Sequence, residues 1–319
     1  MRLLSWVAVR VAVCAATLTV LSVLVFSATE VLPGDAAGVA SGPAATPAER
    51  AAVRVSLGLD RPPLERYLDW AQGAAHGDLG TSMTSGTSVT AVVGARAANS
   101  LAVVLPAALM ILVIAGTAGT WAGLHAGSRA DRVISASGLA LAAAPDFLIA
   151  TALLLGFTLW WPVLPAVAIV PIGQSLWQRP ELVALPALAL ALGGCGATLR
   201  LLRASVAQTA AEPYAGFARL NGYRGPRYAR SIVANAAGPA VQAFSIMLAG
   251  LVGGAVVVET LFNVPGLGQE LTRAVAARDV PLVQGLSLVL GAVALLVLLA
   301  GDVTARLLTA PTRRNGGSR

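Results

Sequence analysis

The chain contains no lysine, few charged residues of either sign and only two cysteines. All 22 of its basic residues are arginine, and charged residues make up 12% of its 319 positions. A soluble domain carries roughly a quarter charged residues, so this chain could not cover its own surface with solvated groups. Apolar residues make up 56%, and the mean hydropathy is +0.76. The composition therefore predicts an integral membrane protein.

The sequence also lacks the usual signatures of catalysis and cofactor binding. Without lysine it cannot form a P-loop, and it has no HExxH or G-x-S-x-G motif. His76 and His125 stand alone, while Cys14 and Cys195 lie inside apolar runs without metal-ligand spacing. The arginines are scattered, without the basic block that nucleic-acid binding requires. We expect no catalytic residues, no metal and no cofactor in this chain, and no nucleic-acid partner.

Six segments are long and apolar enough to cross about 30 Å of hydrocarbon. The first segment has an apolar core longer than that of a signal peptide, so we interpret it as a transmembrane helix. The sequence therefore predicts an all-α polytopic membrane protein with six transmembrane helices and both termini on one side. The segments are Trp6–Ala28, Ser100–Leu124, Val133–Trp160, Leu182–Leu202, Ala240–Leu261 and Leu282–Leu308.

The arginines indicate the orientation of these spans. They gather at both termini, between spans two and three, and between spans four and five. Arginine in short loops marks the cytoplasmic side, so we expect a multi-pass protein of the inner (cytoplasmic) membrane with both termini inside. The predicted parts are a first helix (1–28), an extracytoplasmic loop region (29–99), a five-helix core (100–308) with a cytoplasmic loop (204–239), and a cytoplasmic tail (309–319).

The extracytoplasmic loop region is the only sizeable water-exposed stretch. It has helical composition over Pro47–Leu57 and Leu64–Ala75, and Asp78 is expected to fix a turn by accepting backbone N–H groups. The region is too small for a core of its own. We therefore expect it to pack on the membrane helices.

Few ionisable groups lie within the spans. Asp146 is the only clear candidate deep in one, while Glu259 and Asp302 lie nearer span ends. A carboxylate at depth must face protein or water, so Asp146 either lines a transport path or bonds to a neighbouring helix. An ion-coupled secondary carrier, which would need several such groups, remains the alternative function; a membrane-embedded enzyme is disfavoured by the missing catalytic groups.

The loop between spans four and five contains a short helix signal. Pro213 suits the first turn of a helix, the run Tyr214–Asn221 follows, and Gly222 can end it in left-handed geometry. Such a helix either presents a knob to a cytosolic partner or is an ordinary connector held to lipid phosphates by its arginines.

Glu212–Gly222, followed by Asn235 and Pro239, resembles the EAA loop of ABC-importer permeases of the dipeptide, oligopeptide and nickel type (the DppB/OppB group). Further motifs along the chain agree with this resemblance. They are Leu57–Pro62, Gly77–Ser82, Glu259–Phe262 with Pro265–Gly268, and Ala277–Asp279 with Pro281 and Gln284-Gly285. The chain departs from the family pattern at Gly216 and Asn221, where basic residues are usual.

The resemblance implies the type I importer permease fold and an ATP-driven importer for peptides or a related small solute. Its implied partners are a second homologous permease, two cytosolic ATPases that hold ATP and magnesium, an extracytoplasmic substrate-binding protein and the lipid bilayer. The residues implied to couple to the ATPase are Glu212, Tyr214, Ala218, Asn221 and Gly222.

Besides Asp146, three further residues are candidates for the translocation path or its outer gate. Gly266 and Gly268 either line a gate or only shape a turn after Pro265, and Glu259 either touches cargo or bridges that turn.

The predicted orientation can be tested by labelling. A cysteine at Ser82 should react with an impermeant thiol reagent applied from outside, and one at Ser231 should not. The reverse pattern would overturn both the orientation and the site proposed for ATPase docking.

Overall fold

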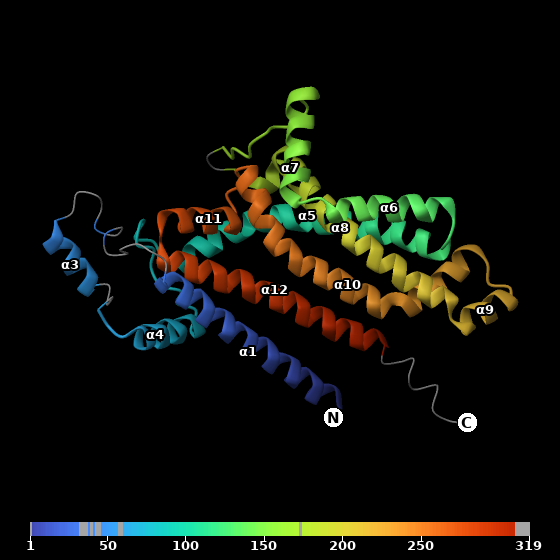
Figure 1. Ribbon diagram of the computed structural model, residues 1–319, viewed down its shortest axis with the longest axis horizontal. Coiled ribbons are helices and arrows are strands. Elements are labelled where there is room, and N and C mark those ends of the chain that lie inside the picture. The colour runs from blue at the N-terminus through green and yellow to red at the C-terminus, as the bar shows by residue number, and fades with distance from the viewer. Residues whose placement is uncertain are drawn as a thin grey trace. The chain divides into compact units, whose positions relative to one another are not determined.

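A computed structural model describes residues 2–31, 38, 41, 46–56, 60–171 and 174–309. Five of its helices are long and apolar enough to cross a membrane by length and composition, and a bent pair would make a sixth. This confirms the predicted all-α polytopic fold (Figure 1). The five helices are α1 (Arg2–Val31), α5 (Val89–Leu124), α8 (Pro180–Ala211), α10 (Gly225–Leu261) and α12 (Val280–Thr309).

The third predicted span is not one continuous helix. It divides into α6 (Arg129–Ala143) and α7 (Asp146–Leu155), which are bent by 100° at the break and followed by a π-helical turn over Gly156–Trp160 (Figure 1). Ala144 is extended, at φ −80° and ψ 127°. Proline disfavours helical geometry in the preceding residue and cannot donate a helix hydrogen bond, so Pro145 ends one helix and begins another.

The helices group into two compact units. Unit 1 comprises residues 1–101 and 263–295, and unit 2 comprises residues 102–262 and 296–319. Helices α5 and α12 contribute to both units.

In unit 1, the α4 part of the loop region 29–99 packs on α1, as expected. Helices α3 (Pro47–Ser56) and α4 (Pro63–Ala75) occupy the two predicted stretches. Phe26 of α1 meets the Tyr67 ring edge-on at 5.5 Å between centroids, and Trp70 lies 6.2 Å away. The Tyr67 hydroxyl is hydrogen-bonded to Ser22 at 2.9 Å, and Arg66 pairs with Glu30.

A buried carboxylate, Asp279, holds the loop before α5. It lies between α11 (Leu267–Ala277) and α12, and it is 1% exposed. Its oxygens accept hydrogen bonds from the Ser82 hydroxyl at 2.5 Å, the Thr84 hydroxyl at 2.8 Å and the backbone N–H groups of Met83 and Thr84. Two motifs that lie 197 residues apart are thereby joined.

The same loop confirms the turn expected at Asp78, whose carboxylate accepts the Gly80 N–H at 2.9 Å. Ser82, however, is buried, at 3% exposure. It is therefore a poor labelling position, and exposed Ser88, which pairs with Thr81 across the loop, is the better external reporter.

Unit 2 is built around α8. Helices α6, α7 and α10 pack against it, and α8 and α10 run side by side (Figure 1). The contact with α6 depends on Gly196: a Cβ there would lie 2.5 Å from the backbone nitrogen of Ala142 and 2.7 Å from the carbonyl oxygen of Gly138. Only glycine permits this approach.

We predict that Asp279→Ala destabilises the protein. Burial raises the pKa of Asp279, but the hydrogen bonds from Ser82 and Thr84 outweigh it and hold this pKa below its ordinary value. Each buried donor left without an acceptor costs about 1–3 kcal/mol, so the unfolding midpoint in detergent should fall. Asp60→Ala, at an exposed position, is the matched control.

The pH dependence follows from the direction of the shift. Because the folded pKa is depressed, the stabilisation is complete above the ordinary carboxyl range and is lost as the pH falls through the folded pKa. Wild type should therefore lose stability on acidification more steeply than Asp279→Ala. Parallel pH curves for the two proteins would contradict this role.

Candidate functional site

A short helix, α9 (Pro213–Leu220), joins the ends of α8 and α10 (Figure 1). Pro213 occupies its first turn, and Gly222 follows its end at φ +81°. The Gly222 N–H donates to the Arg219 carbonyl, and the Tyr223 N–H donates to the Ala218 carbonyl, both at 3.0 Å. The predicted helix and the left-handed glycine that ends it are both confirmed.

A small apolar cluster anchors α9 to the two long helices. Ala215 is fully buried and packs with Val206 of α8 and with Tyr228 and Ile232 of α10. The Arg219 guanidinium lies 4.7 Å from the centre of the Tyr228 ring, a cation–π contact. These contacts tie α9 to the ends of both α8 and α10.

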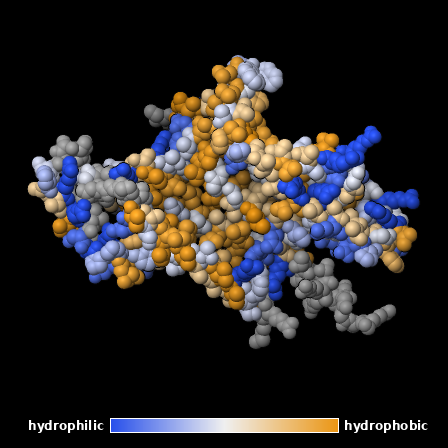
Figure 2. Space-filling model, in the orientation of Figure 1, coloured by the Kyte–Doolittle hydropathy of each residue, from blue (hydrophilic) through white to orange (hydrophobic). Residues whose placement is uncertain are grey.

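The outer face of α9 is apolar. The side chains of Phe217 and Leu220 are 69% and 85% exposed, although polar residues surround this end of unit 2 (Figure 2, right). Sequence reasoning missed both residues. The signal was their spacing of three, which puts two large apolar side chains on one helix face.

The five predicted coupling residues differ in their exposure. Glu212, Asn221 and Gly222 are exposed, and Ala218 is half-buried against the apolar cluster. Tyr214 is 38% exposed. Burial, with smaller contributions from Tyr228 and Glu212, raises the pKa of its phenol.

An ion pair that sequence reasoning also missed fixes α6 to α8 near the same end. Arg203 donates from Nε and Nη2 to the two carboxylate oxygens of Asp131, at 2.9 and 2.7 Å. The Asp131 side chain is 3% exposed. The backbone N–H of Asp131 donates to the hydroxyl of Ser128, which caps α6. The available signal was the Ser128-x-x-Asp131 spacing, which is typical of a helix start.

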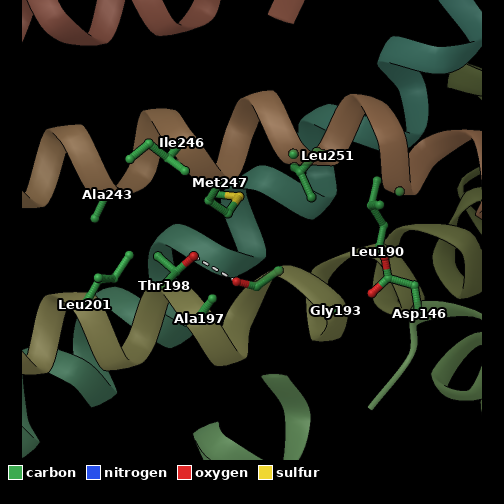
Figure 3. A pocket seen from close by; sticks show the side chains of 13 residues that line it. Asp146, Leu190, Gly193, Ala197, Thr198, Leu201, Ala243, Ile246, Met247 and Leu251 are labelled. Carbon is green, nitrogen blue, oxygen red and sulfur yellow. Dashed lines mark hydrogen bonds between the residues drawn. The ribbon is translucent and has the colours of Figure 1, made fainter. Parts of the chain in front are cut away.

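Asp146 lies in a pocket of about 270 Å³ between α8 and α10 (Figure 3). As the first residue of α7, it is brought there by the bend at Pro145. The other three path candidates lie elsewhere. Glu259 is fully buried in α10, Gly266 caps α11, and Gly268 is buried in the first turn of α11.

Two side chains of α5 hydrogen-bond to the backbone of the turn at Gly266, within unit 1. Asn99 donates to the Pro265 carbonyl at 2.9 Å, and Ser100 accepts the Leu267 N–H at 2.8 Å. This geometry agrees with a role for Gly266 in shaping a tight turn; its role as a gate stays a prediction. Within the described residues, no three His, Cys, Asp or Glu side chains gather as a metal site would require.

Comparison with known proteins gives a consistent result. Residues 115–314 match the family model of the binding-protein-dependent transport system inner membrane component, and residues 3–105 match the model of its N-terminal part. A Brucella ovis protein that carries the name of a peptide permease is 31% identical over 293 residues, covering 90% of this chain and 92% of that protein. The glutathione transport system permease protein GsiC of Escherichia coli K12 is 31% identical over 291 residues, with the same coverage.

These matches cover nearly the whole chain and agree with its all-α fold and membrane-length helices. The family implies a transport system that also has a substrate-binding protein and an ATPase as separate subunits. The chain therefore belongs to the family of binding-protein-dependent inner-membrane transport components, and it is a permease subunit of such an importer.

Proposed function

We propose that the chain is one of two homologous permeases in an importer driven by two cytosolic ATPases, which carries peptides or a related small solute. The peptide class is supported by the names of its relatives, a peptide permease and a glutathione permease. In this proposal ATP and magnesium bind to the ATPases, and the binding protein delivers the cargo from outside.

The observation that carries the proposal is the form of α9. A helix of eight residues presents Phe217 and Leu220 outward while Ala215 ties it to both long helices. Exposed apolar side chains at a polar end are typical of a surface that a protein partner covers. The ATPase is the proposed partner, and its motion on ATP binding would pass through α9 into α8 and α10.

This role requires α9 to lie in the cytoplasm. The arginines of the neighbouring segments support that orientation: Arg219, Arg224, Arg227 and Arg230 lie within or just after α9. Both termini would then also be cytoplasmic. Asp146, Glu259, Gly266 and Gly268 remain the proposed path and gate residues.

Reconstitution tests the proposal against the ion-coupled alternative. The complete complex is placed in proteoliposomes, and uptake of a radiolabelled tripeptide is measured with and without ATP and binding protein. We expect uptake that needs both and that survives ionophores which collapse ion gradients. Uptake without ATP that those ionophores abolish would favour a secondary carrier.

We predict that Gly222→Leu uncouples ATP hydrolysis from transport. The left-handed geometry costs a non-glycine residue roughly 1–2 kcal/mol, and the new side chain would protrude beside the docking face. Uptake should collapse, whereas the complex should still assemble and hydrolyse ATP. Parallel assays of uptake and phosphate release measure the two activities.

Gly86→Leu is the matched control for this prediction. Gly86 has φ +68° with nothing within 4 Å of an added Cβ, as is true at Gly222, but it lies in the loop before α5, in unit 1. The control carries the same backbone strain away from α9 and should retain uptake. Equal loss in both variants would attribute the effect to strain alone.

A further inference from the structure

The pocket between α8 and α10 has an almost entirely apolar wall. Of its 13 lining residues, only Asp146 and Thr198 carry side chains that form strong hydrogen bonds. The Thr198 hydroxyl donates to the Gly194 carbonyl of its own helix at 2.8 Å (Figure 3). That hydroxyl can still accept a hydrogen bond, but Thr198 is only 1% exposed, so the carboxylate of Asp146 is the one charged side chain that lines the pocket.

Two glycines allow this carboxylate to approach the walls of the pocket. A Cβ added at Gly193 of α8 would lie 2.6 Å from Oδ1, and one at Gly254 of α10 would lie 3.4 Å from Oδ2. The carboxylate thus lies between the two helices, beside Leu190 and at one end of the cavity (Figure 3).

The charge has no counterpart within the part of the chain that the structure describes. Across residues 2–31, 46–56, 60–171 and 174–309, no hydrogen bond or ion pair to the Asp146 carboxylate occurs. By contrast, Asp131 and Asp279 are each held by several donors. Asp146 is exposed within this chain, so its carboxylate is open to a solute that enters the pocket, and a carboxylate at membrane depth is costly unless water or a cation reaches it.

The chemistry of the pocket selects among cations. Calcium takes six to eight oxygen ligands and magnesium six, whereas this wall offers one carboxylate and apolar carbon. An ammonium group needs only charge-assisted hydrogen bonds to the carboxylate, and its attached carbons suit the wall formed by Leu190, Met247 and Leu251. A volume of about 270 Å³ exceeds that of several waters and admits such a group.

We propose that Asp146 binds the ammonium group of the cargo, such as the free amino terminus of a peptide, with the adjoining apolar wall against its side chain. The inference rests on the proposed function, because it makes this pocket part of the translocation path. It assigns to the permease a preference for cargo that carries a primary amine.

The first test measures the charge of the pocket without transport. A cysteine replaces Ala197, an exposed pocket residue one helical turn from Gly193, in a chain that carries Cys14→Ser and Cys195→Ala. The assembled complex then reacts with a cationic (trimethylammonium-ethyl) or an anionic (sulfonatoethyl) methanethiosulfonate, in the resting and ATP-trapped states. Each rate is divided by the rate for a free thiol.

With Asp146 present, the cation-to-anion rate ratio should be about tenfold higher than in Asp146→Asn, and Asp146→Glu should preserve it. An equal ratio in Asp146→Asn would overturn the proposal, since it would mean that a cation of another subunit already neutralises the carboxylate. A cysteine that reacts with neither reagent in either state would also overturn it, because the pocket would then be closed to solutes.

The second test uses cargo. Uptake of a tripeptide with a free amino terminus is measured in proteoliposomes containing wild type, Asp146→Asn, Asp146→Glu or Asp60→Asn, the last a control that removes an exposed carboxylate. Asp146→Asn should lower uptake about tenfold, while Asp146→Glu and Asp60→Asn should retain most of it. Equal uptake by Asp146→Asn and Asp60→Asn, at equal expression, would overturn the assignment.

The two tests separate this inference from the proposed function. If wild type shows no uptake that depends on ATP and binding protein, the proposed importer fails, while the rate ratio at Ala197→Cys still reports whether the pocket attracts cations. If wild-type uptake is normal and the rate ratio does not change, only the role of Asp146 fails.

Discussion

Close approach of helix backbones to α8 is the constraint on which unit 2 depends. In a bilayer the hydrophobic effect does not drive helices together, so van der Waals contact between small residues has to hold them. Gly196 of α8 meets the backbone of α6, and a Cβ at Gly123 of α5 would lie 2.8 Å from the Arg203 carbonyl. Helix α8 in turn carries α9 at one end and forms a wall of the Asp146 pocket. The close packing along α8 therefore links the proposed coupling surface to the proposed path.

The scarcity of charge makes the surroundings of three carboxylates informative: Asp131 and Asp279 are buried, whereas Asp146 is exposed. Asp131 is neutralised by Arg203 and fixes α6 to α8, while Asp279 is held by Ser82 and Thr84 and fixes the loop before α5. Both are structural, because their hydrogen bonds come from the chain itself. Asp146 differs, since its carboxylate lies in a cavity and has no such donors among the described residues. This carboxylate is the one that we propose binds a cationic ligand.

The sequence predicted the spans and α9 well, since long apolar runs and the Pro213 and Gly222 signals are local. The bend at Pro145 was missed although the proline is plain in the sequence. A proline inside a membrane helix can either kink the helix or break it. The choice depends on packing against α8, which the sequence does not reveal. The Asp279 and Asp131 contacts join segments far apart in the chain, which no local pattern reveals. The pocket around Asp146 likewise depends on Gly193 and Gly254 meeting the carboxylate from two other helices.

The most direct test of the close-packing constraint is the unfolding midpoint of the purified complex carrying Gly196→Ala, compared with Gly253→Ala. Alanine in a helix interior is intrinsically about 0.5–1 kcal/mol more favourable than glycine, and an added Cβ at Gly253 has nothing within 4 Å. We therefore predict that Gly253→Ala leaves the midpoint unchanged or raises it. Gly196→Ala should lower it, because its Cβ would meet the backbone of Ala142 and Gly138. A midpoint for Gly196→Ala equal to or above that of Gly253→Ala would contradict the constraint.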